Sequence, residues 1–389
     1  MPHSIRLMSA PLLSQARERL GFKRVEVATA AGWSRQRYAE IERSGELTVE
    51  DGLVLSDLLG IDVAALLERQ SLAGSDFAVA ALLKGNAETL TAHARFAITE
   101  ALSVARDVRE VERLLGKTPI VPVTDFREDD DLRHPADGGT HRELAAQVRD
   151  RLGLPPVIGS IVRDVADPLG IIVVRVPFRD LLVDAVSTWT PSSGAIIIIN
   201  EDSSHGRGEY ALRVTLAHEI CHLLFDRNKM REVGSLGELE RPKHSVWPEE
   251  HESIERRARA FQAEFIAPVD LVHAVWNDLG KPTGREAIVA LSNHFGSGAV
   301  AMSWQLEHVT GVHESFPGLT ASLATSAWHE ESEVSTPAEP ASVPRLRRAM
   351  LLGLVKQGWE SGELSSSWAR ELLRIDTTTW EQLAAQWST

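Results

Sequence analysis

The chain has 389 residues, of which 43% are hydrophobic and 25% charged, the composition of a globular protein with room for two or three domains. Its net charge of -14 argues against indiscriminate nucleic-acid binding, and its longest apolar runs, such as Ile196 to Ile199, are far too short to cross a bilayer. The N-terminal residues lack a secretory signal pattern and Cys221 is the single cysteine, so we expect a cytoplasmic protein that would hold any metal through His and carboxylate side chains.

Residues 12 to 67 contain short stretches with apolar residues at helical spacing, separated by single glycines. The predicted helices are Leu12–Leu20, Arg24–Ala31, Ser34–Glu42, Val49–Leu59 and Val63–Leu67. A bundle of five short helices is therefore expected in an N-terminal domain at residues 1–70.

Within this bundle, the segment from Lys23 to Glu42 has the helix, tight turn, helix pattern that places a second helix in the major groove of DNA. Gly32 and Trp33 would form the turn. Residues 1–43 carry eight Lys or Arg and four acidic residues, a local net charge of +4 that predicts a basic face. The candidate DNA-contacting residues lie at the cap and exposed start of the second helix: Ser34, Arg35, Gln36 and Arg37. The alternative is a bundle that binds only protein or dimerises.

Between the two expected domains, residues 71–137 are assigned to a connector and a linker. Residues 77–116 have apolar residues at helical spacing and predict a helical connector. The run from Pro119 to Gly139 is rich in Pro, Asp and Gly and predicts a linker.

A second domain at residues 138–275 combines helices with two β-rich runs, Gly170–Val176 and Ala195–Asn200. Its predicted helices are Leu144–Leu152, Ile158–Ala166, Glu209–Phe225 and Glu252–Ile266. This order predicts an α+β domain with a small sheet.

The remaining residues are expected to be helical on both sides of a spacer. The pattern is helical from Pro268 to Val309, and we assign residues 276–324 to a helical extension. The composition of residues 325–344 predicts a disordered linker. Residues 345–389 are expected to form a short helical appendage whose tryptophans are packing groups: Trp359, Trp368, Trp380 and Trp387.

The strongest chemical pattern is RVTLAHEICHLLF, in which His218 and His222 are four residues apart. On a helix, both imidazoles then emerge on one face and can bind one ion, with Glu219 beside them. A catalytic zinc ion of this type needs a third protein ligand and an open position for water, and Glu255 of the next long helix is the candidate ligand. The ion would activate water and polarise a peptide carbonyl, while Glu219 would transfer the proton. The prediction is a zinc metallopeptidase with an HExxH site of the gluzincin type.

Other side chains compete for these roles. Glu264 lies nine residues after Glu255 on a different face of the same helix, so only one of the two can bind the metal, and the other could orient a ligand imidazole. His244 and His251 are weaker candidates in the loop between the helices, and Cys221 is interpreted as a small buried apolar group. The sequence does not identify the hydrogen-bond donor that stabilises the oxyanion, and three residues are candidates: Tyr210, His205 and His251.

RVTLAHEICHLLF, preceded by AIIIIN and followed by IERRARAFQAEFIAP, resembles the ImmA/IrrE family of regulatory metallopeptidases over about residues 141 to 275. In that family the first Glu of the second helix is a metal ligand, a role that the resemblance places on Glu255. The chain departs from the family at Cys221 and at the three residues before Pro268, positions that concern packing more than chemistry.

Residues 10 to 68 are similar to the Xre/Cro-type helix-turn-helix domain, whose pattern includes the turn seen here as IERSG. Val25 and Glu26 stand where that family often has Gln, so one usual phosphate contact is missing from the pattern.

Together the resemblances imply a fold that is mainly α with an α+β part: a five-helix helix-turn-helix bundle, a zincin-like (gluzincin) domain with a small sheet, and C-terminal helices. They imply a DNA-binding transcriptional regulator that uses Zn2+ to cleave a protein substrate, a repressor, and so derepresses stress, defence or mobile-element genes. The alternative is an Xre-family transcription factor whose zinc domain is a sensor or protein-binding platform without proteolysis. Helix-turn-helix proteins of this type commonly form homodimers.

Overall fold

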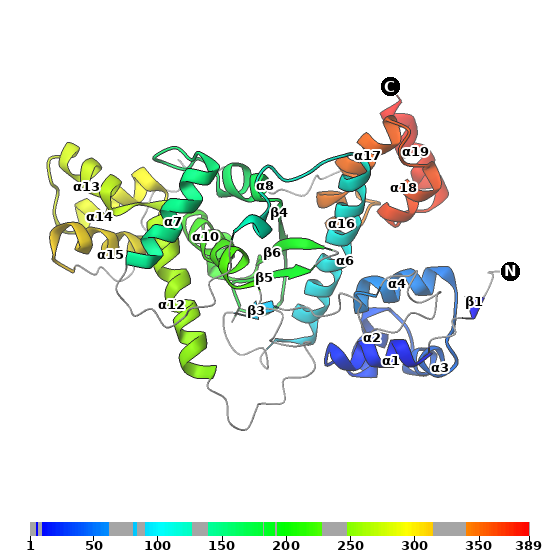
Figure 1. Ribbon diagram of the computed structural model, residues 1–389. Coiled ribbons are helices and arrows are strands. Elements are labelled where there is room, and N and C mark those ends of the chain that lie inside the picture. The colour runs from blue at the N-terminus through cyan, green and yellow to red at the C-terminus, as the bar shows by residue number, and fades with distance from the viewer. Residues whose placement is uncertain are drawn as a thin grey trace.

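The computed structural model describes residues 5–6, 10–61, 81–83, 90–126, 139–181, 183–190, 193–227, 247–313 and 340–388. In these residues, helices predominate and surround a four-stranded sheet (Figure 1). The predicted class, mainly α with an α+β part, is confirmed. Across the described ranges, no helix is both long and apolar enough to cross a membrane.

The N-terminal bundle contains four of the five predicted helices. They are α1 (Ala10–Arg19), α2 (Arg24–Ala30), α3 (Arg35–Ser44) and α4 (Val49–Leu59), with the short strands β1 (Ile5–Arg6) and β2 (Glu46–Leu47) paired antiparallel. The fifth predicted helix, Val63–Leu67, lies outside the described residues. Ser34 begins α3 because its hydroxyl accepts a hydrogen bond from the backbone N–H of Arg37 at 3.1 Å. Gly45 ends the helix at a φ of 70°, a conformation that favours glycine.

The sheet has the order β3 (Ala81–Leu83), β5 (Ala185–Thr190), β6 (Gly194–Asn200), β4 (Ile171–Val176). β4 and β6 are parallel, and the other neighbours are antiparallel. The two β-rich runs of the sequence thus form β4 and β6, whereas β5 was not predicted. Its Ser187, Thr188 and Thr190 are polar although they are buried, so the strand has no apolar run. The helical prediction for residues 77–116 is wrong at β3, because that segment pairs its backbone with β5.

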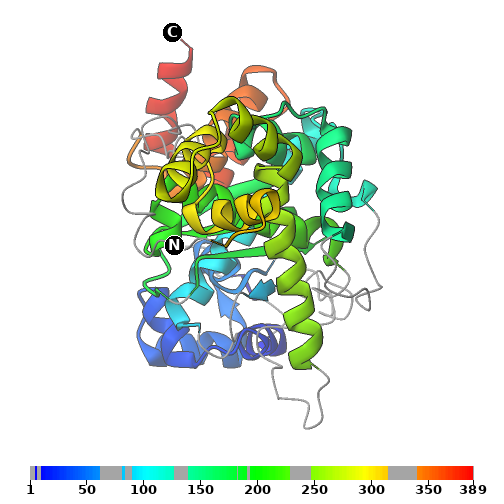
Figure 2. The ribbon, with the colours of Figure 1, turned by 90° about the vertical axis from the view of Figure 1, so that its left-hand side faces the viewer.

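Successive side chains of β6 point to opposite faces of the sheet and divide the core into two layers. Ile197 and Ile199 face one core and Ile196 and Ile198 the other. The first core includes residues of α7 (Gly139–Leu152), α10 (Glu209–Phe225) and α12 (Trp247–Ile266), and the second includes residues of α6 (Ala92–Leu114). The bundle and the C-terminal helices lie beyond α6, away from α12 (Figures 1 and 2).

The C-terminal residues form α16 (Arg345–Met350), α17 (Leu352–Glu360), α18 (Ser366–Leu373) and α19 (Thr377–Trp387). The predicted appendage at residues 345–389 instead shares the second core, because Leu351, Val355 and Leu372 are buried in it together with α6 and β4. The rings of Trp359, Trp380 and Trp387 contact one another with centroids 5.7 to 6.0 Å apart. These three tryptophans therefore act as packing groups, as predicted.

Two predicted segments differ in detail from the structure. The helix predicted at Ile158–Ala166 is a π-helical turn, η3 (Val162–Ala166), followed by α8 (Asp167–Leu169). In the predicted linker, the 3-10 turn η2 (Val123–Asp125) forms, and Val123 and Phe126 are buried in the first core. Residues 127–138 and most of the predicted disordered linker lie outside the described residues.

Asn200, at the end of β6, forms hydrogen bonds with the loop between β4 and β5 and with the turn after β6. Its side-chain oxygen accepts hydrogen bonds from the backbone N–H groups of Phe178 and Asp202 at 3.2 and 3.0 Å. Its amide nitrogen donates to the carbonyl oxygens of Asp180 and Val183 at 2.6 and 2.7 Å. Three of these four hydrogen bonds, all to one buried side chain, thus fix the start of β5 relative to β6. The short helix α9 (Ser204–Arg207) follows β6 in the chain.

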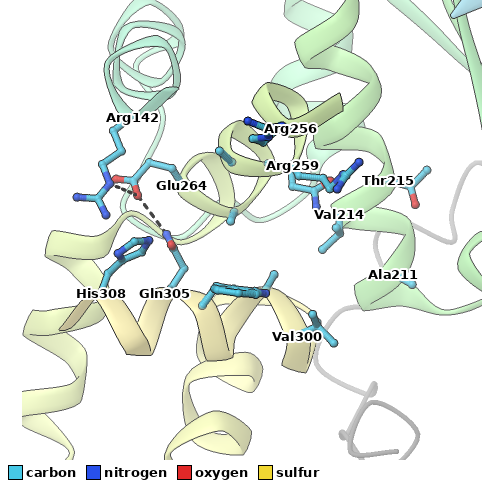
Figure 3. Close-up of a pocket in the computed structure, with 16 residues that line it drawn as sticks. Arg142, Ala211, Val214, Thr215, Arg256, Arg259, Glu264, Val300, Gln305 and His308 are labelled. Atoms are coloured by element: carbon cyan, nitrogen blue, oxygen red, sulfur yellow. Dashed lines mark hydrogen bonds and ion pairs between the residues drawn. The ribbon is translucent and has the colours of Figure 1, made fainter. Parts of the chain in front are cut away.

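The predicted helical region after Pro268 is confirmed as α13 (Val269–Asp278), α14 (Gly284–Phe295) and α15 (Ala299–Thr310). These helices share a small core with Tyr210 of α10. Gln305 of α15 donates to a Glu264 oxygen of α12 at 3.1 Å and to the Ala267 carbonyl at 2.6 Å (Figure 3). The three helices are therefore attached to α10 and α12.

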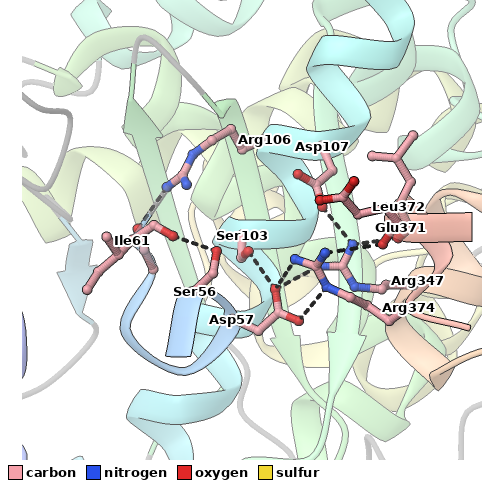
Figure 4. Close-up of polar contacts among 11 residues, drawn as sticks. Ser56, Asp57, Ile61, Ser103, Arg106, Asp107, Arg347, Glu371, Leu372 and Arg374 are labelled. Atoms are coloured by element: carbon pink, nitrogen blue, oxygen red, sulfur yellow. Dashed lines mark hydrogen bonds and ion pairs between the residues drawn. The ribbon is translucent and has the colours of Figure 1, made fainter. Parts of the chain in front are cut away.

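A buried ion-pair network joins the N-terminal bundle to α6 and the C-terminal helices (Figure 4). Arg347 of α16 is only 2% exposed and donates to Asp57 of α4 at 2.7 Å and to Asp107 of α6 at 2.6 Å. Asp57 also accepts from Ser103 of α6 at 2.9 Å and from Arg374 at 3.3 Å. The guanidinium of Arg347 is largely removed from water, so these carboxylates must stabilise its positive charge in place of water.

We predict that Asp57→Asn lowers the free energy of unfolding by about 3 kcal/mol, because it removes one carboxylate from a buried arginine. Urea unfolding of the full chain measures this. The matched control is Glu360→Gln, which breaks the exposed pair between Lys356 and Glu360 (3.7 Å) and should cost less than about 1 kcal/mol. Equal effects of the two variants would contradict a buried network.

The same variant has a predicted pH dependence. Burial raises the pKa of the Asp57 carboxyl, but the charges of Arg347 and Arg374 outweigh burial and hold the pKa below its ordinary value. The stability that Asp57 contributes is therefore present above the unfolded-state pKa of about 3.9 and is lost as the pH falls through the lower folded-state value. Unfolding curves of the wild type and Asp57→Asn should differ most near neutral pH and converge in acid. A difference that grows in acid would contradict the assignment.

Candidate metal centre

The helix that carries the HEICH segment is enclosed by the rest of the fold. Nearly every residue of α10 from Tyr210 to Phe225 is buried, because α10 lies between the sheet, α12 and the α14–α15 connection. Arg213 is fully buried and donates to the carbonyl oxygens of Ile158, Gly159 and Gly296 at 2.7 to 2.9 Å. These bonds fix the position of the helix one turn before its histidines.

Three of the predicted site residues converge at one point. The Nε2 atoms of His218 and His222 are 3.0 Å apart. The two carboxylate oxygens of Glu255 lie 3.4 Å from His218 Nε2 and 3.5 Å from His222 Nε2. All three side chains are buried, and their donor atoms lie within 4.8 Å of one another. The choice of Glu255 over Glu264 as the acid nearest the histidines therefore agrees with the geometry.

These spacings fit a small tetrahedral cation. Zinc binds His nitrogen and carboxylate oxygen at about 2.0–2.1 Å, so ligand atoms at neighbouring corners of a tetrahedron lie about 3.3 Å apart. The observed separations of 3.0 to 3.5 Å bracket that value. Two imidazole nitrogens that face each other and a carboxylate also need a cation or a proton between them, because their lone pairs repel. The donor set thus suits a divalent ion with one position left open.

Asp226 is a functional candidate that the sequence reasoning missed. His222 Nδ1 donates to a carboxylate oxygen of Asp226 at 2.9 Å, which turns Nε2 of the same ring toward His218 and Glu255. Arg257 of α12 donates to the other Asp226 oxygen, so the carboxylate is held from two helices. The signal was present in the spacing, because Asp226 follows His222 by four residues, one helical turn. Glu264, suggested for this orienting role, instead accepts from Val269 N and Gln305.

Glu219 lies beside the three converging residues and has a partner of its own. Ser187 of β5 donates to a Glu219 oxygen at 2.6 Å, and both side chains are almost completely buried. The hydrogen bond occupies one carboxylate oxygen and leaves the other for a further ligand. Sequence reasoning could not identify Ser187, because the strand that carries it was not predicted.

Electrostatics at the site favour a neutral imidazole next to an ionised acid. Burial lowers the pKa of the His218 imidazole. Burial alone would raise the pKa of Glu255, but hydrogen bonds to His218 and His222 outweigh it and hold that pKa far below its ordinary value. A neutral imidazole and a carboxylate are the protonation states that bind a metal ion.

The remaining residues considered for the site either lie in other surroundings or have side chains that the structure does not describe. The hydroxyl of Tyr210 donates to Asn293 of α14 at 2.8 Å within the small core of α13–α15, so this residue is not placed to stabilise an oxyanion. The side chains of His205 and His251 are not described, and His244 lies outside the described residues. Cys221 is fully buried among apolar residues, as predicted.

The candidate DNA-contacting residues lie together at the exposed start of α3. Ser34, Arg35, Gln36 and Arg37 are all exposed. Arg37 forms an ion pair with Asp51 of α4 at 2.6 Å, and its guanidinium lies 4.8 Å from the ring centre of Trp33. The structure thus restrains Arg37 within the bundle.

Comparison with protein families agrees with both regions. Residues 166–306 match the family described as IrrE N-terminal-like domain (Peptidase M78), and residues 13–66 match a helix-turn-helix family. The first match covers β4, β5 and β6 and runs from there into α15, so it extends beyond the predicted domain end at residue 275. No curated protein and no solved structure matches the chain. The two matches support DNA binding and a metallopeptidase-type hydrolase domain. The chain thus joins an N-terminal segment similar to helix-turn-helix domains to a segment similar to the IrrE N-terminal-like domain.

Proposed function

We propose that this protein is a DNA-binding transcriptional regulator with zinc-dependent endopeptidase activity, and that its substrate is a repressor protein. The observation that carries the proposal is the convergence of His218, His222 and Glu255 with a second acid, Glu219, beside them. Three ligands and a neighbouring acid that is not needed as a ligand suit a catalytic zinc site better than a closed structural one. Both domain matches are consistent with a cytoplasmic regulator.

In the proposed reaction, some of these residues bind the metal ion, one transfers a proton and the others position these groups. A zinc ion held by His218, His222 and Glu255 would supply water activation and polarise the peptide carbonyl. Glu219 accepts the proton of the attacking water and passes it to the leaving amine. Ser187 holds one Glu219 oxygen, so the other stays directed at the water. Asp226 keeps the ring of His222 in the orientation that exposes Nε2.

We expect Glu219→Gln to lower the rate of repressor cleavage by about 100-fold or more, because the amide cannot take a proton from water. Purified full chain is incubated with candidate repressor proteins, and products are followed by mass spectrometry. Zinc content, measured by elemental analysis, should stay at the wild-type level because Glu219 is not a ligand.

The control is Glu286→Gln, the same chemical change at an exposed position of α14. It should cleave at the wild-type rate. Undiminished cleavage by Glu219→Gln would exclude Glu219 as the base.

Asp226→Asn is expected to weaken zinc binding by about 10- to 100-fold, because the orienting carboxylate of His222 is lost. Competition with a chromophoric zinc chelator measures the affinity. Asp278→Asn, at the exposed end of α13, provides the matched change without a ligand contact. If both variants bound zinc as the wild type does, Asp226 would have no part in the metal site.

For the N-terminal domain, we predict that Arg35→Ala or Gln36→Ala weakens binding to the promoter DNA of this gene by about tenfold, the size of one lost base contact. Fluorescence anisotropy at a single stated salt concentration measures the affinity. Arg113→Ala, an exposed arginine of α6, is the control for loss of one positive charge. Similar losses in all three variants would indicate charge alone and argue against base readout by α3.

The alternative function is a transcription factor whose zinc domain senses metal or binds a partner without proteolysis. It predicts that Glu219→Gln leaves regulation of the target genes unchanged, whereas the proposed function requires that derepression is lost. A reporter gene under the cognate promoter separates the two.

A further inference from the structure

A pocket of about 630 Å³ lies between α10, α12 and α15, with Arg142 of α7 at its edge (Figure 3). This volume falls in the range of pockets that bind a small molecule or a few side chains. Its lining is mainly apolar and comes from three helices: Val214, Ala260, Ala263, Val300, Ala301 and Trp304.

The pocket adjoins the candidate metal centre along two helices. Thr215 lines it and precedes His218 by three residues on α10. Arg259 lines it and follows Glu255 by four residues on α12. Residues three and four apart on a helix are neighbours on one face, with Cβ atoms about 5–6 Å apart. The pocket therefore begins about one helical turn from two of the three proposed ligands.

Large apolar side chains at the pocket are left open to solvent by the described part of the chain. Trp304 is 52% exposed and Val300 is 68% exposed, both on the face of α15 that lines the pocket. Exposed aromatic and aliphatic groups beside a cavity are typical of a binding surface, because covering them releases water.

The rim of the pocket is positively charged. Arg142, Arg256 and Arg259 line it, against one acid, Glu264. Glu264 accepts a hydrogen bond from Gln305 at 3.1 Å and forms an ion pair with Arg142 at 3.8 Å. Its negative charge is therefore balanced by a neighbouring arginine. Arg259 is exposed and forms no ion pair with any residue within the described ranges. A guanidinium in this position is suited to bind a carboxylate through two parallel hydrogen bonds.

Building on the proposed function, we propose that this pocket is a specificity site that binds a large apolar side chain of the protein substrate close to the cleaved bond, with an acidic side chain of the same segment on Arg259. Residues of an extended peptide are about 3.3 Å apart, so two residues span about 7 Å, enough to reach from the metal centre into the pocket. The apolar lining and the positive rim fit the two parts of such a segment.

The experiment measures binding without cleavage, in the full chain carrying Glu219→Gln. Three fluorescent blocked hexapeptides differ at two adjacent positions: Phe-Glu, Phe-Lys and Ala-Glu. Anisotropy titrations should show that the Phe-Glu peptide binds at least about tenfold more tightly than the other two, the size of one charge-assisted contact. Equal affinities for the three peptides would overturn the proposal.

Two further changes assign the preference to the pocket. Arg259→Glu should reverse the charge preference, so that the Phe-Lys peptide binds best. Ala301→Trp fills the pocket and should remove the advantage of Phe over Ala. Arg113→Glu on α6 should change neither preference, and thermal unfolding checks that each variant folds. Wild-type preferences in both pocket variants would also overturn the proposal.

The outcomes separate this inference from the proposed peptidase function. If the peptide preferences hold but wild-type protein cleaves no repressor, the pocket is a peptide-binding site and the endopeptidase proposal fails. If cleavage is observed but the peptides bind equally, only the specificity proposal fails. If Arg259→Glu changes the oligomeric state in light scattering and the peptides bind equally, the surface joins two copies of the chain and the proposal is wrong.

Discussion

The burial of α10 is the constraint on which the rest of the structure depends. Polar and charged groups inside a core need partners, because an unpaired polar group there costs several kcal/mol. The fold supplies partners from separate segments: three carbonyl groups for Arg213, Ser187 for Glu219 and Asp226 for His222. Within the described residues, Nδ1 of His218 has no hydrogen-bond partner. The position of the helix and the orientation of its reactive groups are thus determined together.

The small sheet connects this helix to the remainder of the chain. Its one face packs on α10 and α12, and its other face packs on α6 and the C-terminal helices. The N-terminal bundle contacts α6 as well, through the stacked rings of Phe22 and Phe96 and through the Asp57 network. The N-terminal bundle and the candidate metal centre are therefore attached to opposite sides of one sheet.

The different roles that we propose for the two glutamates of the site rest on their surroundings more than on their residue type. Glu255 and Glu219 are both buried glutamates, yet one is surrounded by two imidazoles and the other accepts a hydrogen bond from a serine. The pKa of the first is held low, which suits a metal ligand, whereas the second has one oxygen left for the proposed proton transfer. The neighbouring pocket, with its exposed Trp304 and Arg259, adds the surface to which we assign the selection of the substrate segment.

The sequence by itself determined the helices and the histidine pair. Val49–Leu59 is bounded by local capping groups, and HEICH places two histidines one turn apart on any helix, so both features can be predicted from short-range spacing. Three other features depend on contacts between residues far apart in the sequence, and only the tertiary structure decided them. β5 is a strand because Ser187 and its polar neighbours pair with β6, the last helices cover the sheet because α6 leaves apolar surface for them, and Glu255 meets the histidines because α12 packs across α10. None of these three features follows from the secondary-structure propensity of its own segment, since each is stabilised by residues far away along the chain.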